Sequence, residues 1–211
     1  MPENFNYDVR EGTYGTSYGA FAEITRDEQT GALTFGEPKP FTGLRSVSFE
    51  TSQESSPFFA DNREHLSLSG APTTTGSLKT YQFSKDFLVY IGKKIMANGG
   101  MTDTGSFKAF VWQFIETVTD EFGNSYDELR IFYNVKAGVP TAESVTDEDS
   151  VTLKEFEVPL TASQSSFVVD EDGKAVTEFT IRRTEANATL FDLAYEQVIL
   201  PTDIPTASPI A

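Results

Sequence analysis

The residues that could do chemistry in this 211-residue chain are few, apart from its carboxylates. The chain has no cysteine and one histidine, His65, so a thiolate site, a multi-histidine metal site and a cysteine nucleophile are all excluded. A Ser/His/Asp triad would have to use that one histidine, yet no flanking serine lies in the context of a nucleophile elbow. We therefore predict that His65 is a strand or loop residue and not a catalytic base.

One acidic motif resembles part of a calcium-binding loop, Asp170-x-Asp172-Gly173. When the motif is aligned on its glycine, Val168 takes the first ligand position and Phe179 takes the place of the bidentate glutamate. The motif therefore fails as a calcium site. The sequence predicts a turn with solvated acids at this position, and no metal or other cofactor is expected.

Paired carboxylates are the machinery of glycoside hydrolysis. Glu155, Glu157 and Glu178 fall on predicted strands and could face one another across a groove. Nothing in their spacing specifies such a pair, and chance pairs are expected among 32 acidic residues. An acidic glycosidase is therefore kept only as a third interpretation.

The charge balance excludes several partners. The chain has 16 Lys and Arg against 32 Asp and Glu, a formal net charge of −16, and a sequence pI near 4.4. Binding to DNA or RNA depends on clustered cations that neutralise phosphates, and anionic membrane surfaces require the same. No run of about 18 apolar residues is present, and residues 1–12 lack the apolar region of an export signal. We expect neither nucleic-acid binding nor a membrane partner.

The elements that must position these residues are mainly β-strands. Short stretches of period two, rich in Phe, Val, Thr and Tyr, alternate with turn residues. Residues 106–119 are apolar on both faces, which predicts a strand covered on both sides, and the turn at 120–124 joins them to the alternating residues 129–136 in a hairpin. Other strands are expected at 46–51, 155–160 and 175–182, whereas 190–200 fits a strand or a helix.

One short helix is predicted at 85–91, with Ser84 as its N-cap. Its end carries the motif Phe87, Ile91 and Gly92, in which the glycine closes the helix. Residues 51–62, 93–105 and 138–150 lack periodicity and are predicted to be loops, which are often functional at this length. A single domain is expected over residues 1–200, followed by a proline-containing extended arm at 201–211.

Five segments of the chain occur in a characteristic order: FAEIT at 21–25, LTFGEP at 33–38, GLRSVSFE at 43–50, FFADN at 58–62 and DFLVYIG at 86–92. This ordered set resembles the major tail protein of long-tailed bacteriophages, the tail-tube subunit. The similarity is strongest over residues 14–92 and looser over 107–181.

The resemblance implies a β-sandwich or partial barrel with one flanking helix. It implies a non-enzymatic virion protein, assembled in the host cytoplasm, whose hexameric rings stack into the tube that delivers DNA. Expected partners are further copies of the chain, a tape-measure protein, and tail terminator and baseplate proteins. By the same analogy the 201–211 arm and one loop contact neighbouring rings, and the loop residues are Pro57, Phe58, Phe59, Ala60, Asp61 and Asn62.

The acidic composition has a role under this interpretation. A lumen that conducts DNA must not hold it, and carboxylates without matching cations repel phosphate. Glu155, Glu157 and Glu178, on polar strand faces, are the predicted lumen-facing acids.

The rival interpretation is a β-sandwich adhesin or carbohydrate-binding module of a phage tail. Such a module would use exposed aromatics as stacking platforms. Tyr14, Tyr18 and Trp112 are the candidates, although the alternating apolar residues around Trp112 favour core packing. Assembly separates the two classes, because a tube subunit must form contacts that close into rings.

Overall fold

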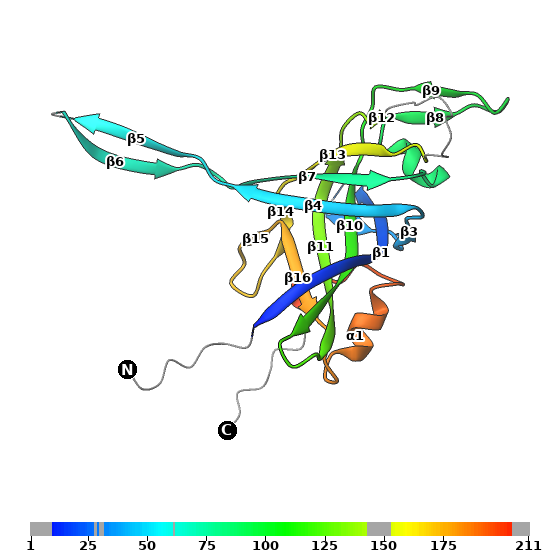
Figure 1. Ribbon diagram of the computed structural model, residues 1–211. Helices are drawn as coiled ribbons and strands as arrows, with labels where there is room; N and C mark the ends of the chain where they lie inside the picture. Colours follow the sequence, from blue (N-terminus) through cyan, green and yellow to red (C-terminus); the bar gives the residue numbers. More distant parts are fainter. Residues whose placement is uncertain (1–9, 28, 30–31, 61, 143–152, 204–211) are drawn as a thin grey trace, which may run out of the picture.

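The computed structural model describes residues 10–27, 29, 32–60, 62–142 and 153–203, and its fold is mainly β, as predicted (Figure 1). Within this part of the chain, one antiparallel sheet has the order β2-β1-β10-β11-β13-β7-β4, with β3, β12 and β16 pairing to β1, β13 and β11. Its strands are β1 (Glu11–Arg26), β2 (Leu33–Phe35), β3 (Lys39–Pro40), β4 (Leu44–Ser52), β7 (Thr73–Thr80), β10 (Ala109–Asp120), β11 (Ser125–Ala137), β12 (Thr141–Ala142), β13 (Phe156–Ala162) and β16 (Glu178–Arg182).

Three two-stranded hairpins and three short helices complete the described elements. The hairpins are β5 (Ser55–Ala60) with β6 (Arg63–Ser69), β8 (Lys93–Ile95) with β9 (Met101–Asp103), and β14 (Ser165–Val169) with β15 (Ala175–Val176). The helices are the 3₁₀-helix η1 (Lys85–Val89), the α-helix α1 (Ala188–Leu193) and the 3₁₀-helix η2 (Pro201–Asp203).

The predicted hairpin lies at the centre of the sheet. β10 pairs with β11 on one side and with β1 on the other. Alternate residues of β10 enter two different hydrophobic clusters, since Trp112 belongs to one and Val111 to the other. The strand is therefore covered on both faces, as its sequence predicts.

The first cluster lies between the two halves of the sheet. β4, β7 and β13 contribute aliphatic side chains and Phe49, while β1, β10 and β11 contribute half of the aromatic rings. Phe87 of η1 is fully buried among them, with its ring centroid 5.1 Å from that of Phe21 and 4.9 Å from that of Phe41. Edge-to-face rings of this kind add to the free energy of area burial.

The second cluster lies on the opposite face of β10 and β11, where α1 and the chain after it cover the sheet. Residues 190–200, which the sequence leaves open, begin in α1 and continue as turns. Two buried side chains of the sheet hold them. Gln113 Nε2 donates to the Ala194 carbonyl oxygen (2.6 Å), and the Tyr133 hydroxyl donates to the Ile199 carbonyl oxygen (2.6 Å). Long-range hydrogen bonds therefore settle an ambiguity that local periodicity cannot.

The predicted helix differs from the structure in type, in length and at its start. It is a 3₁₀-helix of five residues, and Ser84 makes no side-chain cap. The Ser84 Oγ is buried and has no hydrogen-bond partner among the described residues. Helix η1 ends at Val89 with Tyr90 as its C-cap, so Gly92 lies beyond the helix and does not close it directly. The φ of Gly92 is +72°, and an added Cβ would lie 3.1 Å from the Phe107 ring. Phe87 and Ile91 are both buried in the first cluster.

The loop predictions at 51–62 and 93–105 are wrong. Residues 51–52 end β4, 55–60 form β5, and 93–95 pair with 101–103 as β8 and β9. These strands lack an apolar alternation because both faces of each hairpin meet solvent. Most of 138–150 and the arm residues 204–211 lie outside the described residues, whereas 201–203 form η2.

Candidate assembly surfaces

One face of the sheet is lined with hydroxyl groups. In β4, β7 and β13 every second residue points into the first cluster, so the intervening residues point outward. The register places Ser48 opposite Ser77, and their hydroxyl oxygens lie 3.3 Å apart. We call this surface the hydroxyl face, and its neutral polar members are Ser46, Ser48, Thr75, Ser77 and Thr161.

The charges on the hydroxyl face are partly compensated. Lys79 of β7 lies directly opposite Glu157 of β13, with 3.8 Å between Nζ and Oε2. Arg45 forms an ion pair with Glu155, which precedes β13. Glu50 is the remaining acid of the β4 row. The face is therefore polar and weakly charged, in contrast to the chain as a whole.

The hydroxyl face ends at an open edge. β4 is the last strand on its side of the sheet and pairs only with β7 in the described part of the chain. On the other side, the short strand β12 pairs with the start of β13. An edge strand presents unpaired N–H and C=O groups, which form a template for pairing with another chain.

The three acids predicted to share a lumen do not share a face. Glu157 points outward from β13, whereas Glu178 lies directly opposite Phe132, a member of the first cluster. Arg130 Nε donates to Glu178 Oε1 (2.7 Å), and the guanidinium lies over the Phe114 and Phe132 rings. Only Glu155 and Glu157 could line one wall, and their lumen position stays a prediction.

Arg130 is held as a cation by its surroundings. Burial acts to lower its pKa, but the hydrogen bond and charge of Glu178, together with Glu116, outweigh burial and raise the pKa. The pKa of Arg182 is raised by the hydrogen bonds that its guanidinium donates to Glu11 and Glu128, and these bonds join β16 to β1 and β11. Arg130 and Arg182 are therefore bound to carboxylates within the molecule, and they do not form a cationic patch that could bind phosphate.

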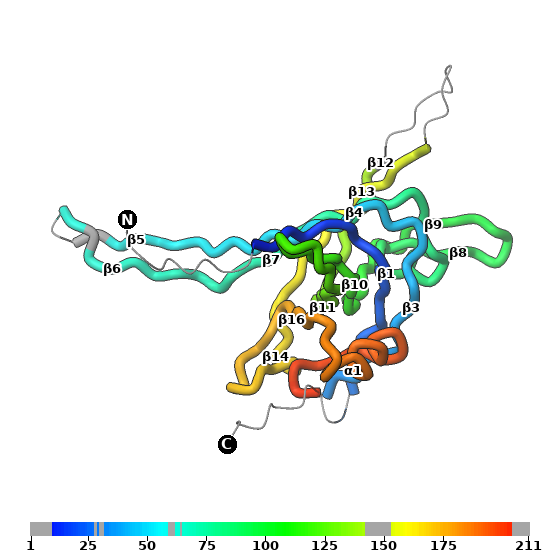
Figure 2. The backbone as a smooth tube through the Cα atoms, turned by 60° about the horizontal axis from the view of Figure 1, so that its bottom comes forward, coloured from blue at the N-terminus to red at the C-terminus, as the bar shows by residue number. Residues whose placement is uncertain are grey.

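The predicted contact loop is the first strand of a projecting hairpin. Pro57 and Phe58 lie on β5, Phe59 and Ala60 end it, and Asn62 lies in the turn with a φ of +60°. Asp61 lies outside the described residues. Figures 1 and 2 both show this hairpin extending away from the body of the molecule. Its contact with another ring stays a prediction.

The residues considered for catalysis or metal binding lie in a strand and in a turn. His65 is an exposed residue of β6, which agrees with its prediction as a strand residue. Asp170 Oδ1 accepts the backbone N–H groups of Asp172 and Lys174, which is the expected turn. In the described ranges, no group of three His, Cys, Asp or Glu residues could hold a metal ion.

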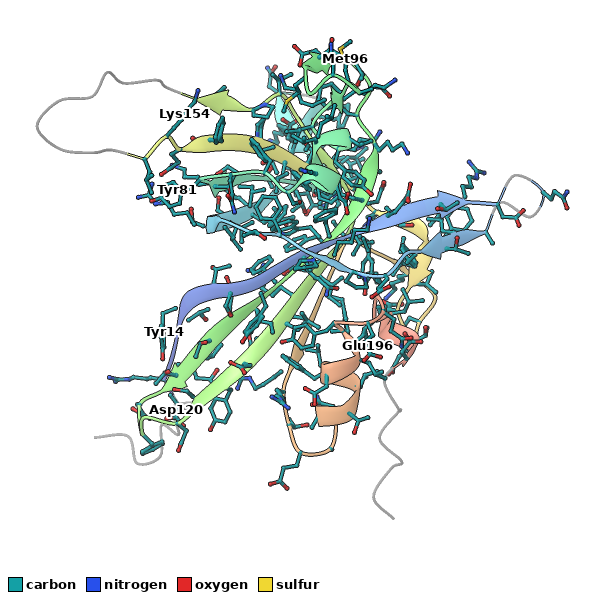
Figure 3. All side chains as sticks on the ribbon, turned by 90° about the vertical axis from the view of Figure 1, so that its right-hand side faces the viewer. Tyr14, Tyr81, Met96, Asp120, Lys154 and Glu196 are labelled. Atoms are coloured by element: carbon teal, nitrogen blue, oxygen red, sulfur yellow. The ribbon has the colours of Figure 1, made fainter. Side chains whose placement is uncertain are left out.

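The aromatic residues that a carbohydrate-binding module would use differ in their exposure. Trp112 has no exposed surface and is a core residue. Tyr14 and Tyr18 are 60% and 69% exposed, and Tyr18 makes an edge-to-face contact with Tyr195. Figure 3 places Tyr14 and Asp120 at one end of the molecule and Met96 at the other.

None of the helices in the described ranges combines the length and the apolar character that a membrane crossing requires.

A match to a family model identifies the class of this chain. The model is described as phage tail tube protein and matches residues 3–207. The chain belongs to this family, which confirms the resemblance seen in its sequence. It is a tube subunit and a component of the phage tail. Members of the family are structural proteins, and each associates with other copies of itself.

Solved structures similar to this chain include two tubes. The first is the PVC sheath-tube complex of an extracellular contractile injection system in its extended state, with 13% identity, a TM-score of 0.41, and coverage of 79% of this chain and 89% of that one. The second is the SPP1 tail tube, with 9% identity, a TM-score of 0.38, and coverage of 80% and 78%. No curated protein gives a significant match.

The hydroxyl face is the surface that sequence reasoning missed. Its serines and threonines carry neither charge nor catalytic potential, so the sequence pointed to acidic residues as the candidates for the lumen. The available signal is the alternation of Ser46 and Ser48 with Val47 and Phe49, which is typical of a strand with one face in the core.

Proposed function

We propose that copies of this chain associate side by side into rings, with the hydroxyl face lining the lumen, and that the rings stack into the tail tube. The observation that carries this proposal is the polar, weakly charged face that ends at the open edge of β4. The edge of β4 in one copy pairs with the β12 edge of the next, so that the wall continues from subunit to subunit. The ring is hexameric, as the family resemblance implies.

The chemistry of the hydroxyl face suits a conduit for DNA. A wall of hydroxyl groups, with Glu155 and Glu157 compensated by Arg45 and Lys79, offers no cationic cluster that would neutralise phosphates. Weak charge also avoids the large field that uncompensated carboxylates would create. DNA therefore passes along the wall without being bound.

The remaining partners follow from the same proposal. The tube polymerises around a tape-measure protein in the host cytoplasm, and terminator and baseplate proteins occupy its ends in the virion. The chain acts without a cofactor and catalyses no reaction.

Electron microscopy of the purified protein across a concentration series, with mass photometry at the dilute end, tests the assembly. We expect monomers at low concentration and rings or tubes with a central channel at high concentration. Monomers at every concentration, also after addition of the tape-measure protein, would contradict the proposal. A glycan-binding screen would then test the adhesin interpretation through Tyr14 and Tyr18.

The orientation of the wall has a separate test, because the chain contains no cysteine. Ser77→Cys places a thiol on the hydroxyl face, and Glu196→Cys places one beyond α1, on the opposite layer. We expect a bulky polyethylene glycol maleimide to label both monomers but only the Glu196→Cys tube. Fast labelling of Ser77→Cys in intact tubes would contradict a lumen position.

A further inference from the structure

Two hairpins of this molecule carry apolar side chains that the described residues leave about half exposed. In β5–β6, Phe58 lies directly opposite Leu66, and Leu68 follows on the same face. These side chains are 52%, 51% and 52% exposed. We call them the aromatic hairpin face.

The second hairpin, β8–β9, is smaller and has a similar surface. Ile95 lies directly opposite Met101, and Met96 begins the turn between the strands. Their exposed fractions are 44% for Ile95, 46% for Met96 and 57% for Met101. We call them the methionine hairpin face. Methionine is flexible and polarisable, and its sulfur packs favourably against aromatic rings.

Hairpins of two strands are marginally stable in water unless another surface covers them. The two hairpins project at opposite ends of the molecule in both Figure 1 and Figure 2. One copy therefore cannot bring them together, whereas a second copy placed along the same axis can. Such a contact joins two different surfaces, so it can be repeated from copy to copy.

The net charges of the two hairpins indicate which surface of a second copy packs on the aromatic hairpin face. In the sequence, residues 92–106 contain two lysines and one aspartate, a net charge of +1 in a chain whose total is −16. Residues 53–70 contain three acids and one arginine, a net charge of −2 with histidine neutral. Lys93 pairs with Asp103 within the methionine hairpin, so Lys94, on the reverse face, carries its net charge. The methionine hairpin as a whole is thus basic and the aromatic hairpin is acidic. Complementary charges favour their association and disfavour the pairing of two aromatic hairpins.

We propose that the aromatic hairpin face of one copy packs on the methionine hairpin face of another copy. This inference rests on the proposed tube function, since it supplies the receiving surface for a contact between subunits. Phe58 and Leu66 bury their apolar surface against Ile95 and Met101, and the opposite charges set the direction of the contact.

Cysteine cross-linking tests the contact. The chain has no cysteine of its own, so only the introduced thiols can react. Leu66→Cys and Met101→Cys are combined in one chain at an assembling concentration and treated with a short bis-maleimide. We expect a ladder of dimers, trimers and longer oligomers on a denaturing gel. In a mixture of the two single variants with different mass tags, we expect only the mixed dimer.

The matched control places the thiols on the reverse faces of the same hairpins. Ser67 lies opposite Pro57, and Thr102 lies opposite Lys94, so Ser67→Cys with Thr102→Cys should give monomer only. A dimer of Leu66→Cys with itself, or no ladder from the double variant, would overturn the inference. Tubes without a ladder would overturn this contact and leave the proposed function standing. A ladder without tubes would support the contact and contradict the tube.

Discussion

Among the described glycines, Gly76 of β7 is the one at which an added Cβ would lie nearest to another atom. A Cβ added there would lie 2.1 Å from the Ser48 carbonyl oxygen and 2.8 Å from the Phe49 ring, which itself stacks on Phe132 with 3.8 Å between centroids. We expect Gly76→Ala to lower the free energy of unfolding by about 3 kcal/mol, because the backbone and a packed ring must both move. Urea unfolding of the dilute monomer measures this change.

Gly12 of β1 is the matched control for that substitution. It is also a strand glycine, and an added Cβ there meets nothing within 4 Å. Gly12→Ala should change stability by less than about 0.5 kcal/mol. Equal effects of the two substitutions would show that backbone freedom, and not close approach, explains the glycine at position 76.

Asp120 makes the β10–β11 turn sensitive to acid. Its carboxylate accepts hydrogen bonds from the Asn124 side chain and backbone, from the Phe122 backbone and from the Tyr126 hydroxyl, and these bonds lower its pKa. A lowered pKa in the folded state means that the stabilisation is complete above the ordinary aspartate pKa. It is lost as the pH falls through the lowered value.

We therefore expect Asp120→Asn to be less stable than the parent at pH 7 and to lose less further stability on acidification. Urea midpoints at a series of pH values below 7 measure both effects. Glu121→Gln, in the same turn, is the control and should keep the acid dependence of the parent. A parallel acid dependence of the parent and Asp120→Asn would contradict this role.

At the scale of the element, η1 begins without the cap that its sequence predicts. The Ser84 Oγ is buried and finds no hydrogen-bond partner in the described part of the chain, whereas a true N-cap would satisfy a backbone N–H. We expect Ser84→Ala to leave stability unchanged or to raise it by up to about 1 kcal/mol, because an unpaired buried hydroxyl is removed. Thermal and urea unfolding both report this change.

Thr80 provides the contrasting hydroxyl. Its Oγ1 is buried, and its single O–H lies within hydrogen-bond distance of the carbonyl oxygens of Gly43 (2.9 Å) and Gln82 (2.6 Å). Thr80→Val keeps the shape of the side chain and should cost about 1–2 kcal/mol, since it removes these hydrogen bonds and the one that Thr80 Oγ1 accepts from the Gln82 N–H. A loss of similar size in Ser84→Ala would show that Ser84 caps η1 after all.

Strands and helices could be predicted where the spacing of their apolar residues reflects a buried face. The 106–136 hairpin is correct because both of its faces meet a cluster, so apolar residues occur on both faces of its first strand. The hairpins at 55–69 and 93–103 were not predicted, because their apolar residues belong to neither of the two clusters that the described residues form. Helix η1 was found through its apolar side chains, although its cap and its type were not.

At the scale of the whole molecule, the net charge of −16 opposes assembly. Raising the salt concentration from about 0.1 M to about 1 M shortens the Debye length from about 10 Å to about 3 Å. We therefore expect the critical concentration for tube formation to fall as salt is added. Sedimentation of assembled protein across a salt series measures it.

A variant with fewer negative charges provides a second test of this prediction. A double variant in the β14–β15 turn, Glu171→Gln with Asp172→Asn, removes two exposed charges and should assemble at lower salt than the parent. A critical concentration that rises with salt would indicate instead that ion pairs between copies dominate the contacts.

The sequence by itself determined the mainly β fold, the central hairpin and the family. Alternation along a strand and the order of motifs are properties of the chain alone, so they can be read without coordinates. The lone His65 and the absence of cysteine likewise exclude whole classes of chemistry from composition.

Only the tertiary structure decided which polar residues share a surface. Glu157 and Glu178 both lie on strands, yet one points outward from β13 and the other points toward the first cluster beside Arg130. The hydroxyl face is likewise assembled from β4, β7 and β13, which are distant in sequence. Local pattern specifies that a strand has two faces, but the pairing of distant strands determines which neighbours each face meets.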